Sequence, residues 1–221
     1  MRKRHTLPNV DSRHTRAKSL AAAALFVVFF AVGCGGARPS KYYGLTVPGN
    51  ATAAAASPNA APVTLLIGRI TAPELYREDP IVYSAGETMG TYEYHRWVEP
   101  PTQMIQEILL RELRESGRFR NVVLLRSDIH GDFLLHGHLF DFREVNSGSR
   151  IARVTMEMEL RNIKTGTTVW THFYSHDEPA NGKDVDSLVS ALDKNTQGAV
   201  AEFRASLDEY FAQHPPAQSA P

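Results

Sequence analysis

The chain has 221 residues, with 24 basic and 24 acidic side chains and a single cysteine, Cys34. One cysteine excludes an intramolecular disulfide, so the fold must be held by its hydrophobic core. The first 33 residues hold six of the basic and one of the acidic side chains, which leaves the rest of the chain with a net charge of about −5. This negative charge argues against a nucleic-acid-binding surface and against broad adhesion to anionic lipid.

The N-terminal segment has the pattern of a lipoprotein signal peptide. Basic residues open the chain (MRKR), and an uncharged apolar run follows over residues 20–32. As a helix this run would cover about 20 Å, less than the roughly 30 Å core of a bilayer, which predicts a signal-peptide h-region rather than a membrane span. Ala31, Val32 and Gly33 then precede Cys34, and small residues before a cysteine are typical of a lipobox.

We therefore expect cleavage between Gly33 and Cys34, removal of residues 1–33, and covalent attachment of a diacylglycerol and an N-acyl lipid to Cys34. The alternative is an ordinary secretory signal in which a cysteine falls near the cleavage site by chance. Gly35 follows Cys34, whereas an aspartate there would be the usual inner-membrane retention signal. The sequence thus predicts a lipid anchor in the periplasmic face of the outer membrane, in preference to the inner membrane.

Residues 34–62 are expected to form a lipid-anchored, flexible N-terminal segment. It contains a first strand over residues 41–47, which ends at a proline. The Ala-rich stretch over residues 49–62 lacks large apolar side chains to bury and is expected to be a loose linker.

Residues 63–213 carry the pattern of one domain, and residues 214–221 that of a disordered tail. Apolar and alternating runs predict strands over residues 63–70, 81–84, 92–97, 119–125, 133–142, 151–163 and 167–175. Helical spacing predicts one helix that opens at Pro100-Pro101 and stops at Ser116-Gly117, and another over residues 184–213. We predict an α+β fold, in which two helices pack on one face of a mostly antiparallel sheet and the other face is free for a partner.

The histidines are the first candidates for chemistry, because His130, His136 and His138 lie close in sequence. His136 and His138 would project from the same face of a strand, but a zinc site needs further ligands, so we expect no metal site. No serine lies in a G-x-S-x-G elbow, no phosphate-binding loop is present, and Glu157 and Glu159 alternate with methionine as on a solvated sheet face. The sequence predicts no catalytic site, and no cofactor besides the lipid on Cys34.

Aromatic side chains in residues 92–97 suggest a protein contact. Tyr92, Tyr94 and Trp97 surround Arg96 in a predicted hairpin, and these residue types dominate interface energetics. The competing explanation is that the aromatic side chains pack in the core or across strands.

The order of short motifs along the chain resembles the ABC-type transport auxiliary lipoprotein family, the PqiC-like lipoproteins. The resemblance covers nearly all of residues 34–213. The motifs that carry it are Cys34, Tyr42-Tyr43-Gly44-Leu45, Ile70-Thr71-Ala72-Pro73-Glu74-Leu75, Ile81-Val82-Tyr83, Arg96-Trp97-Val98-Glu99-Pro100, Gly131-Asp132-Phe133-Leu134-Leu135, Phe142, the hairpin at residues 164–170, Pro179 and the closing helix.

The resemblance implies a fold similar to the amino-terminal domain of TolB. It also implies a non-enzymatic accessory subunit of a transport system that moves lipids between inner and outer membranes. Its partners would be the membrane, an MCE-domain protein and an ABC permease, with a homo-oligomer as a further expectation and no nucleic acid. The alternatives are a lipoprotein that assists outer-membrane assembly or secretion, similar to the LptE-like or curli-secretion lipoproteins, and an anchored hydrolase.

Overall fold

The computed structural model describes residues 38–47, 60–126, 128–146 and 148–216. The predicted signal peptide, Cys34 and most of the Ala-rich stretch lie outside these residues, as does the last part of the predicted tail. From residue 40 onwards the described residues form one compact unit. In the described part of the chain, no helix is long and apolar enough to cross a membrane.

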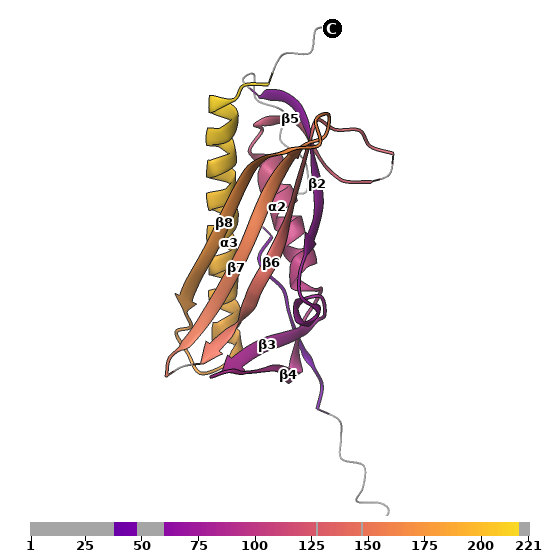
Figure 1. The fold of residues 1–221 in the computed structure, drawn as a ribbon. Coiled ribbons are helices and arrows are strands. Elements are labelled where there is room, and N and C mark those ends of the chain that lie inside the picture. Colours follow the sequence, from indigo (N-terminus) through magenta and orange to yellow (C-terminus); the bar gives the residue numbers. More distant parts are fainter. Residues whose placement is uncertain (1–37, 48–59, 127, 147, 217–221) are drawn as a thin grey trace, which may run out of the picture. The chain divides into compact units, whose positions relative to one another are not determined.

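The described residues form one eight-stranded sheet, two α-helices and a short 3-10 helix (Figure 1). The strands are β1 (Lys41–Tyr43), β2 (Ala61–Thr71), β3 (Pro80–Ala85), β4 (Thr88–Trp97), β5 (Phe119–Leu124), β6 (Phe133–Asn146), β7 (Arg150–Asn162) and β8 (Thr168–Pro179). The helices are η1 (Glu74–Tyr76), α2 (Pro101–Glu115) and α3 (Val185–Gln213).

The sheet is built around β6. One edge of β6 pairs with β7 over its whole length in an antiparallel ladder, and β7 pairs in the same way with β8. The other edge of β6 is divided, since its first half pairs with β2 and its last residues pair with β3, both in parallel. β5 extends the sheet from β2, and β4 and then β1 extend it from β3.

The predicted α+β fold with a mostly antiparallel sheet is confirmed, because the long ladders β6–β7 and β7–β8 and the hairpin β3–β4 are antiparallel. The parallel pairs made by β1, β2 and β5 were not expected. A parallel neighbour requires a long crossover, and the chain between β2 and β5 runs through β3, β4 and α2 before it returns. Such pairing joins segments far apart in sequence and leaves no local signal.

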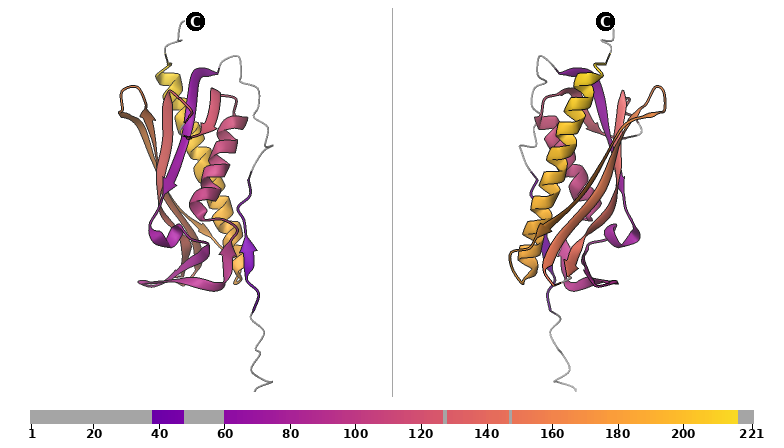
Figure 2. Two further views of the ribbon diagram at one scale, coloured as in Figure 1. Left: turned by 90° about the vertical axis from the view of Figure 1, so that its right-hand side faces the viewer. Right: turned by 60° about the vertical axis from the view of Figure 1, so that its left-hand side comes forward.

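Both helices cover the same face of the sheet, and they begin where the sequence predicts (Figure 2). Pro101 occupies the first position of α2, where a missing N–H is no loss. α3 is capped by Asp184, whose side chain accepts a hydrogen bond from the Ser187 backbone N–H at 2.9 Å. The core lies between helices and sheet and includes Ile105, Ile108, Leu135, Phe142, Met156, Leu160, Leu192 and Phe203.

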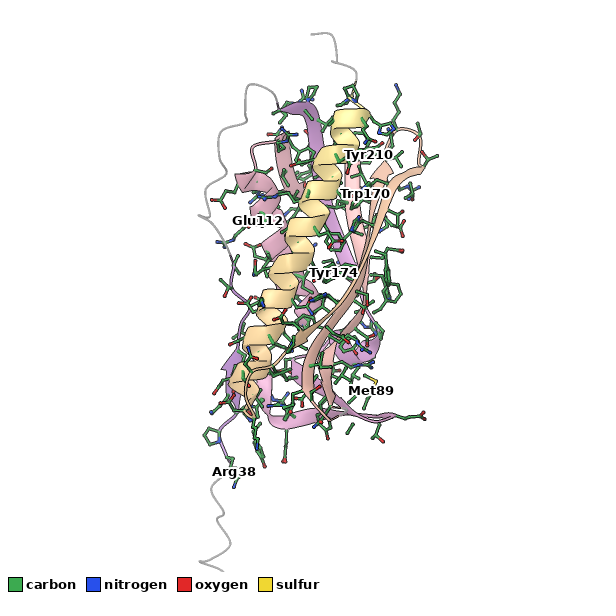
Figure 3. All side chains as sticks on the ribbon, turned by 90° about the vertical axis from the view of Figure 1, so that its left-hand side faces the viewer. Arg38, Met89, Glu112, Trp170, Tyr174 and Tyr210 are labelled. Carbon is green, nitrogen blue, oxygen red and sulfur yellow. The ribbon has the colours of Figure 1, made fainter. Side chains whose placement is uncertain are left out.

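The polar side chain of Asn195 fastens α3 to the sheet. It is 2% exposed, and its amide nitrogen donates to the backbone carbonyls of Ala152 and His176, both at 2.9 Å. The Tyr174 hydroxyl donates to the Asn195 side-chain oxygen at 2.7 Å, and Trp170 on the same strand donates to Ser206 at 3.1 Å. Figure 3 labels Tyr174 and Trp170 among the side chains of the domain. These bonds satisfy groups that would be costly to bury unpaired.

The segment after β1 crosses to α3 rather than extending the predicted strand over residues 41–47. The Thr46 backbone N–H and hydroxyl donate to the two carboxylate oxygens of Asp193 at 2.9 and 2.6 Å. The Gln197 side chain donates to the Thr46 carbonyl at 2.6 Å, and Leu45 is buried. Thr46 therefore pairs with helix side chains instead of a strand, and β1 ends at Tyr43.

Candidate functional site

The helices leave the opposite face of the sheet uncovered (Figure 2), and this face is called the open face below. Its residues follow from strand register and alternation. They include Leu66 and Gly68 of β2, Leu134, His136 and His138 of β6, Glu157, Glu159 and Arg161 of β7, and Thr171 and Phe173 of β8. Glu157 and Glu159, which the sequence analysis places on a solvated sheet face, lie on the open face. Both are half-buried there.

His136 and His138 share the open face, as the sequence predicts. They lie opposite Glu159 and Glu157 on β7, and the His138 ring nitrogen Nδ1 is 2.8 Å from the Thr71 hydroxyl. Within the described residues no three histidine, cysteine or acidic side chains gather as metal ligands would. The described neighbours of His136 and His138 are thus hydrogen-bonding and charged side chains: Glu159, Glu157 and Thr71.

One end of the open face is polar and internally paired. Arg153 of β7 forms two hydrogen bonds of 2.7 Å with the Asp177 carboxylate of β8. The Arg153 guanidinium holds the pKa of Asp177 below its usual value. Asp141 forms an ion pair with Arg143 at 3.1 Å and accepts a hydrogen bond from the Tyr76 hydroxyl at 3.3 Å. Charges that already neutralise one another leave little to attract a ligand.

Two exposed aromatic rings lie in the middle of this face. Phe140 and Phe173 are 43% and 55% exposed, and their ring centroids are 6.1 Å apart. The His138 ring packs edge-on against Phe140 at 4.5 Å. Aromatic side chains are enriched at protein interfaces, so this pair is a better contact candidate than a single exposed residue would be.

An apolar groove begins at the other end of the open face and continues past β2 to Gln106 of α2. It consists of two adjoining hollows of about 370 and 540 Å³ that share Leu125 and Leu134. The first is lined by Leu66, Leu125, Ile129, His130, Gly131, Leu134, Arg161 and Ile163. The second is lined by Ile67, Gly68, Arg69, Gln106, Leu125, Arg126, Leu134 and His136.

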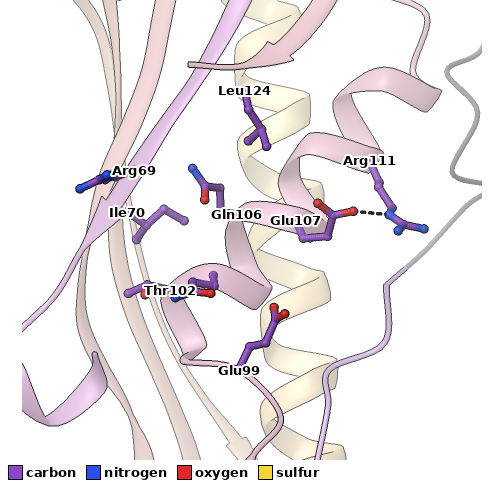
Figure 4. Close-up of a pocket in the computed structure, with 9 residues that line it drawn as sticks. Arg69, Ile70, Glu99, Thr102, Gln106, Glu107, Arg111 and Leu124 are labelled. Carbon is purple, nitrogen blue, oxygen red and sulfur yellow. Dashed lines mark hydrogen bonds and ion pairs between the residues drawn. The ribbon is translucent and has the colours of Figure 1, made fainter. Parts of the chain in front are cut away.

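A larger, more polar pocket of about 710 Å³ lies between β2 and α2 (Figure 4). Glu107 and Arg111, one helical turn apart on α2, form an ion pair at 2.6 Å inside it. The Gln106 amide donates to the Gly68 carbonyl at 2.5 Å. The wall of this pocket contains Arg69 and Glu99 as well, so its charges are mixed, and no cluster for acid–base or nucleophilic chemistry forms among its residues.

A buried ion pair lies at the junction of β4, β6 and β7. Glu144 is 3% exposed and forms two hydrogen bonds with the Arg150 guanidinium, at 2.8 and 2.7 Å. The Tyr92 hydroxyl donates to the same carboxylate at 2.6 Å. Arg150 also donates to the Asp184 carbonyl at 2.7 Å, which ties the sheet to the start of α3.

Burial raises the pKa of the Glu144 carboxyl, but hydrogen bonds from Arg150 and Tyr92 lower it further, so the pKa lies below its usual value. Burial together with the bond to Glu144 raises the pKa of Tyr92 to about 12. The sequence analysis missed this cluster. Strand alternation could have located it. Glu144 lies two residues after buried Phe142 and so shares its face of β6, and Arg150 shares the face of buried Ala152 and Val154 on β7.

The structure separates the four predicted contact residues and corrects the assignment of two. Trp97 is 1% exposed and packs on Phe142 with ring centroids 5.5 Å apart, so it belongs to the core. The Tyr92 hydroxyl is engaged with the Glu144–Arg150 pair. Arg96 pairs with Asp79 at 2.9 Å, and Tyr94 is half-buried. Trp97 lies in the core, while Tyr92 and Arg96 are engaged with partners within the domain, so the four residues form no continuous contact patch.

Similarity to known proteins identifies the family of this chain and proteins that share its fold. A family model described as the ABC-type transport auxiliary lipoprotein component matches residues 43–203. No curated protein matches the chain by sequence.

Among solved structures, a protein of the DUF330 family from Xanthomonas campestris superposes with a TM-score of 0.67 at 16% identity, over 79% of this chain and 98% of that one. An uncharacterised protein superposes with a TM-score of 0.60 at 14% identity, over 77% and 99%. At these identities the similarity shows a shared fold alone.

Proposed function

Because this chain belongs to the ABC-type transport auxiliary lipoprotein component family, we propose that it is a non-catalytic accessory subunit of an ABC transport system that moves lipids between the inner and outer membranes. Its partners in this role are an MCE-domain protein and the ABC permease. The proposed anchor is the diacylglycerol and N-acyl lipid on Cys34, inserted in the periplasmic face of the outer membrane.

The observation that carries the proposal is the extent of the family match. It runs from the last residue of β1 into α3 and so includes the seven strands β2 to β8 in full. The described surface supports a binding role as well, since its hollows are lined by apolar, amide and mostly paired charged groups. A hydrolase would need a nucleophile and a base that converge on one cleft.

The length of the tether supports an orientation on the membrane. Lys41 follows Cys34 by seven residues, which span at most about 25 Å when fully extended. β1 pairs with β4 at the end of the domain that also holds β3, and the C-terminal end of α3 lies at the opposite end (Figure 1). In the proposed arrangement the end with β1 faces the anchoring membrane and the other end faces the periplasm.

Co-purification from native membranes tests the proposal. The full-length chain, tagged at its C-terminus, is solubilised from native host envelopes in mild detergent, and the bound proteins are identified by mass spectrometry. We expect a permease, its ATPase and an MCE-domain protein. Recovery of outer-membrane assembly or secretion proteins in their place would contradict the proposal, as would hydrolysis of a lipid or glycan by the pure chain.

A further inference from the structure

We propose that the apolar groove of the open face binds one acyl chain of an anionic phospholipid, with the headgroup phosphate held by the arginine side chains at the rim. This inference rests on the proposed function and deepens it, because it assigns this domain a direct contact with lipid. The occupant follows from the shape of the groove, from its apolar floor and from the charge at its rim.

The floor of the groove suits a hydrocarbon chain. Leu66 and Leu134 are cross-strand neighbours on β2 and β6. They line the same hollow as Leu125 and Ile163. Leu125 and Ile163 are 49% and 42% exposed, so apolar surface that could be covered is left in water. Each hollow falls within the range of about 300–1,000 Å³ that is typical of small-molecule sites.

Two glycines pack tightly against the side chains that line the groove. A Cβ atom at Gly131 would lie 2.5 Å from Leu66 Cγ, and one at Gly68 would lie 3.0 Å from Leu134 Cδ1 and 3.1 Å from His136 Cβ. Any larger residue at either position would push into the floor or the wall. The absence of a side chain at each position lets the backbone pack directly against Leu66, Leu134 and His136, which closes the floor of the groove.

The rim of the groove is cationic. Arg69, Arg126 and Arg161 line the two hollows, and His130 and His136 add ring N–H donors. No carboxylate lines either hollow within the described residues, although Glu159 lies opposite His136 on β7. The ion pairs within the described part of the chain include neither Arg69 nor Arg126, so both guanidinium groups can bind a phosphate, which arginine binds with two parallel hydrogen bonds.

The groove lies away from the anchor. It surrounds the first half of β6, whereas the strands next to β1 join the last residues of β6. A lipid in this groove would therefore be held at the end of the domain that faces the periplasm, where it could be passed to or from a partner rather than rest in the anchoring bilayer.

Site-specific photocrosslinking in native cells tests the inference. A photoreactive phenylalanine derivative is introduced in place of Leu125, and separately of Ile163, in the full-length chain. The matched control position is Ala205, which is exposed on α3. After irradiation of cells grown in radioactive phosphate, labelled protein is digested, and the peptide that carries the probe is weighed by mass spectrometry. The lipid on Cys34 contains no phosphate and does not interfere.

We expect phospholipid adducts at positions 125 and 163 and none at position 205. The double variant Arg69→Glu and Arg126→Glu should lower the yield about tenfold, because two phosphate contacts are replaced by repulsion. Arg77→Glu, a charge reversal at the exposed arginine that follows η1, should leave the yield unchanged. Equal urea unfolding midpoints for these variants establish that the fold is intact.

Several results would overturn the inference: no adduct at either groove position, adducts of a fatty acid or a protein instead of phospholipid, equal labelling at position 205, or an unchanged yield in the double arginine variant. The co-purification above separates this failure from that of the proposed function. If the transporter proteins still co-purify, the lipid groove alone is refuted; if they are absent too, both proposals fail.

Discussion

Glu144 places a carboxylate in the interior, where an unpaired charge would cost several kcal/mol. Arg150 and Tyr92 supply three hydrogen bonds that offset this cost, and Arg150 adds the bond to the start of α3. The hydrogen bonds of Glu144 and Arg150 therefore connect β4, β6, β7 and the start of α3. Breaking the pair by removing one partner should be far more costly than a change at an exposed acid.

Glu144→Gln should lower the free energy of unfolding by about 3 kcal/mol, since the substitution leaves Arg150 without its counterion. The wild-type carboxyl has a pKa below its usual value of 4.5. Its contribution to stability is thus fully present above pH 4.5 and is lost as the pH falls through the folded-state pKa. Urea titrations at several pH values measure both effects, with Glu87→Gln in the exposed β3–β4 turn as the control. Equal stability of the two variants would contradict the assignment.

Trp97→Ala should unfold the domain or destabilise it by about 3–5 kcal/mol, because it removes a fully buried ring from the core. Tyr94→Ala, on the same strand and half-buried, should cost much less. Thermal melts of both variants, combined with the co-purification, distinguish the core from the surface. A Trp97→Ala protein that melts like wild type but loses its partners would restore Trp97 as an interface residue.

At the residue scale, the sequence predicted side chains best where one pattern alone decided their position. His136 and His138 share a face because strand alternation leaves no other choice. The burial of the aromatic residues of β4 was harder to predict, since alternation tells which residues share a face but not which face lies against the core. Trp97 points into the core because β4 pairs with β3, and β3 with the end of β6, which are contacts distant in sequence.

At the scale of elements, the first half of α3 joins the sheet to the segment that follows β1. Its first turn receives the bond from Arg150, its middle is fixed by Asn195, and Asp193 and Gln197 hold the segment that follows β1. Residues 38–40 and β1 lie nearer to Cys34 in the sequence, so the attachment of the following segment to α3 helps to fix β1, where the proposed tether joins the domain.

Asp193→Ala should release this segment, because the Thr46 backbone N–H and hydroxyl both lose their acceptor. We expect faster hydrogen exchange at the Thr46 amide and a loss of about 1 kcal/mol in unfolding free energy. Ser190→Ala on the same helix removes only a bond to the helix's own backbone and is the control. Unchanged exchange at Thr46 would show that the segment is held by other contacts.

The elements that the sequence predicted well are those with local signals. The β7–β8 hairpin follows from the alternation over residues 151–163 and from the turn at Gly166, whose φ of 73° suits glycine. The limits of α2 follow from its proline start and from Gly117, which has a φ of 60°. The apolar groove could not be predicted, since Leu66, Leu125, Leu134 and Ile163 are brought together by the parallel pairing of β2 with β5 and β6.

At the scale of the whole molecule, the account depends on Cys34 as the membrane anchor. Cys34→Ser should abolish labelling by radioactive palmitate and release the chain from firm membrane attachment, because more than one acyl chain is needed for stable retention. Labelling of cells and sedimentation of their membranes measure both properties. A variant that is still labelled and sediments like wild type would place the anchor elsewhere.

The central claim is that the chain assists lipid movement between the two membranes, and the transfer of newly made phospholipid tests it most directly. Native host cells with and without the chain are pulse-labelled, and the inner and outer membranes are separated at successive times. The account predicts that the transfer rate changes when the chain is deleted and is restored by the wild-type chain but not by Cys34→Ser. Identical transfer rates in cells with and without the chain would contradict it.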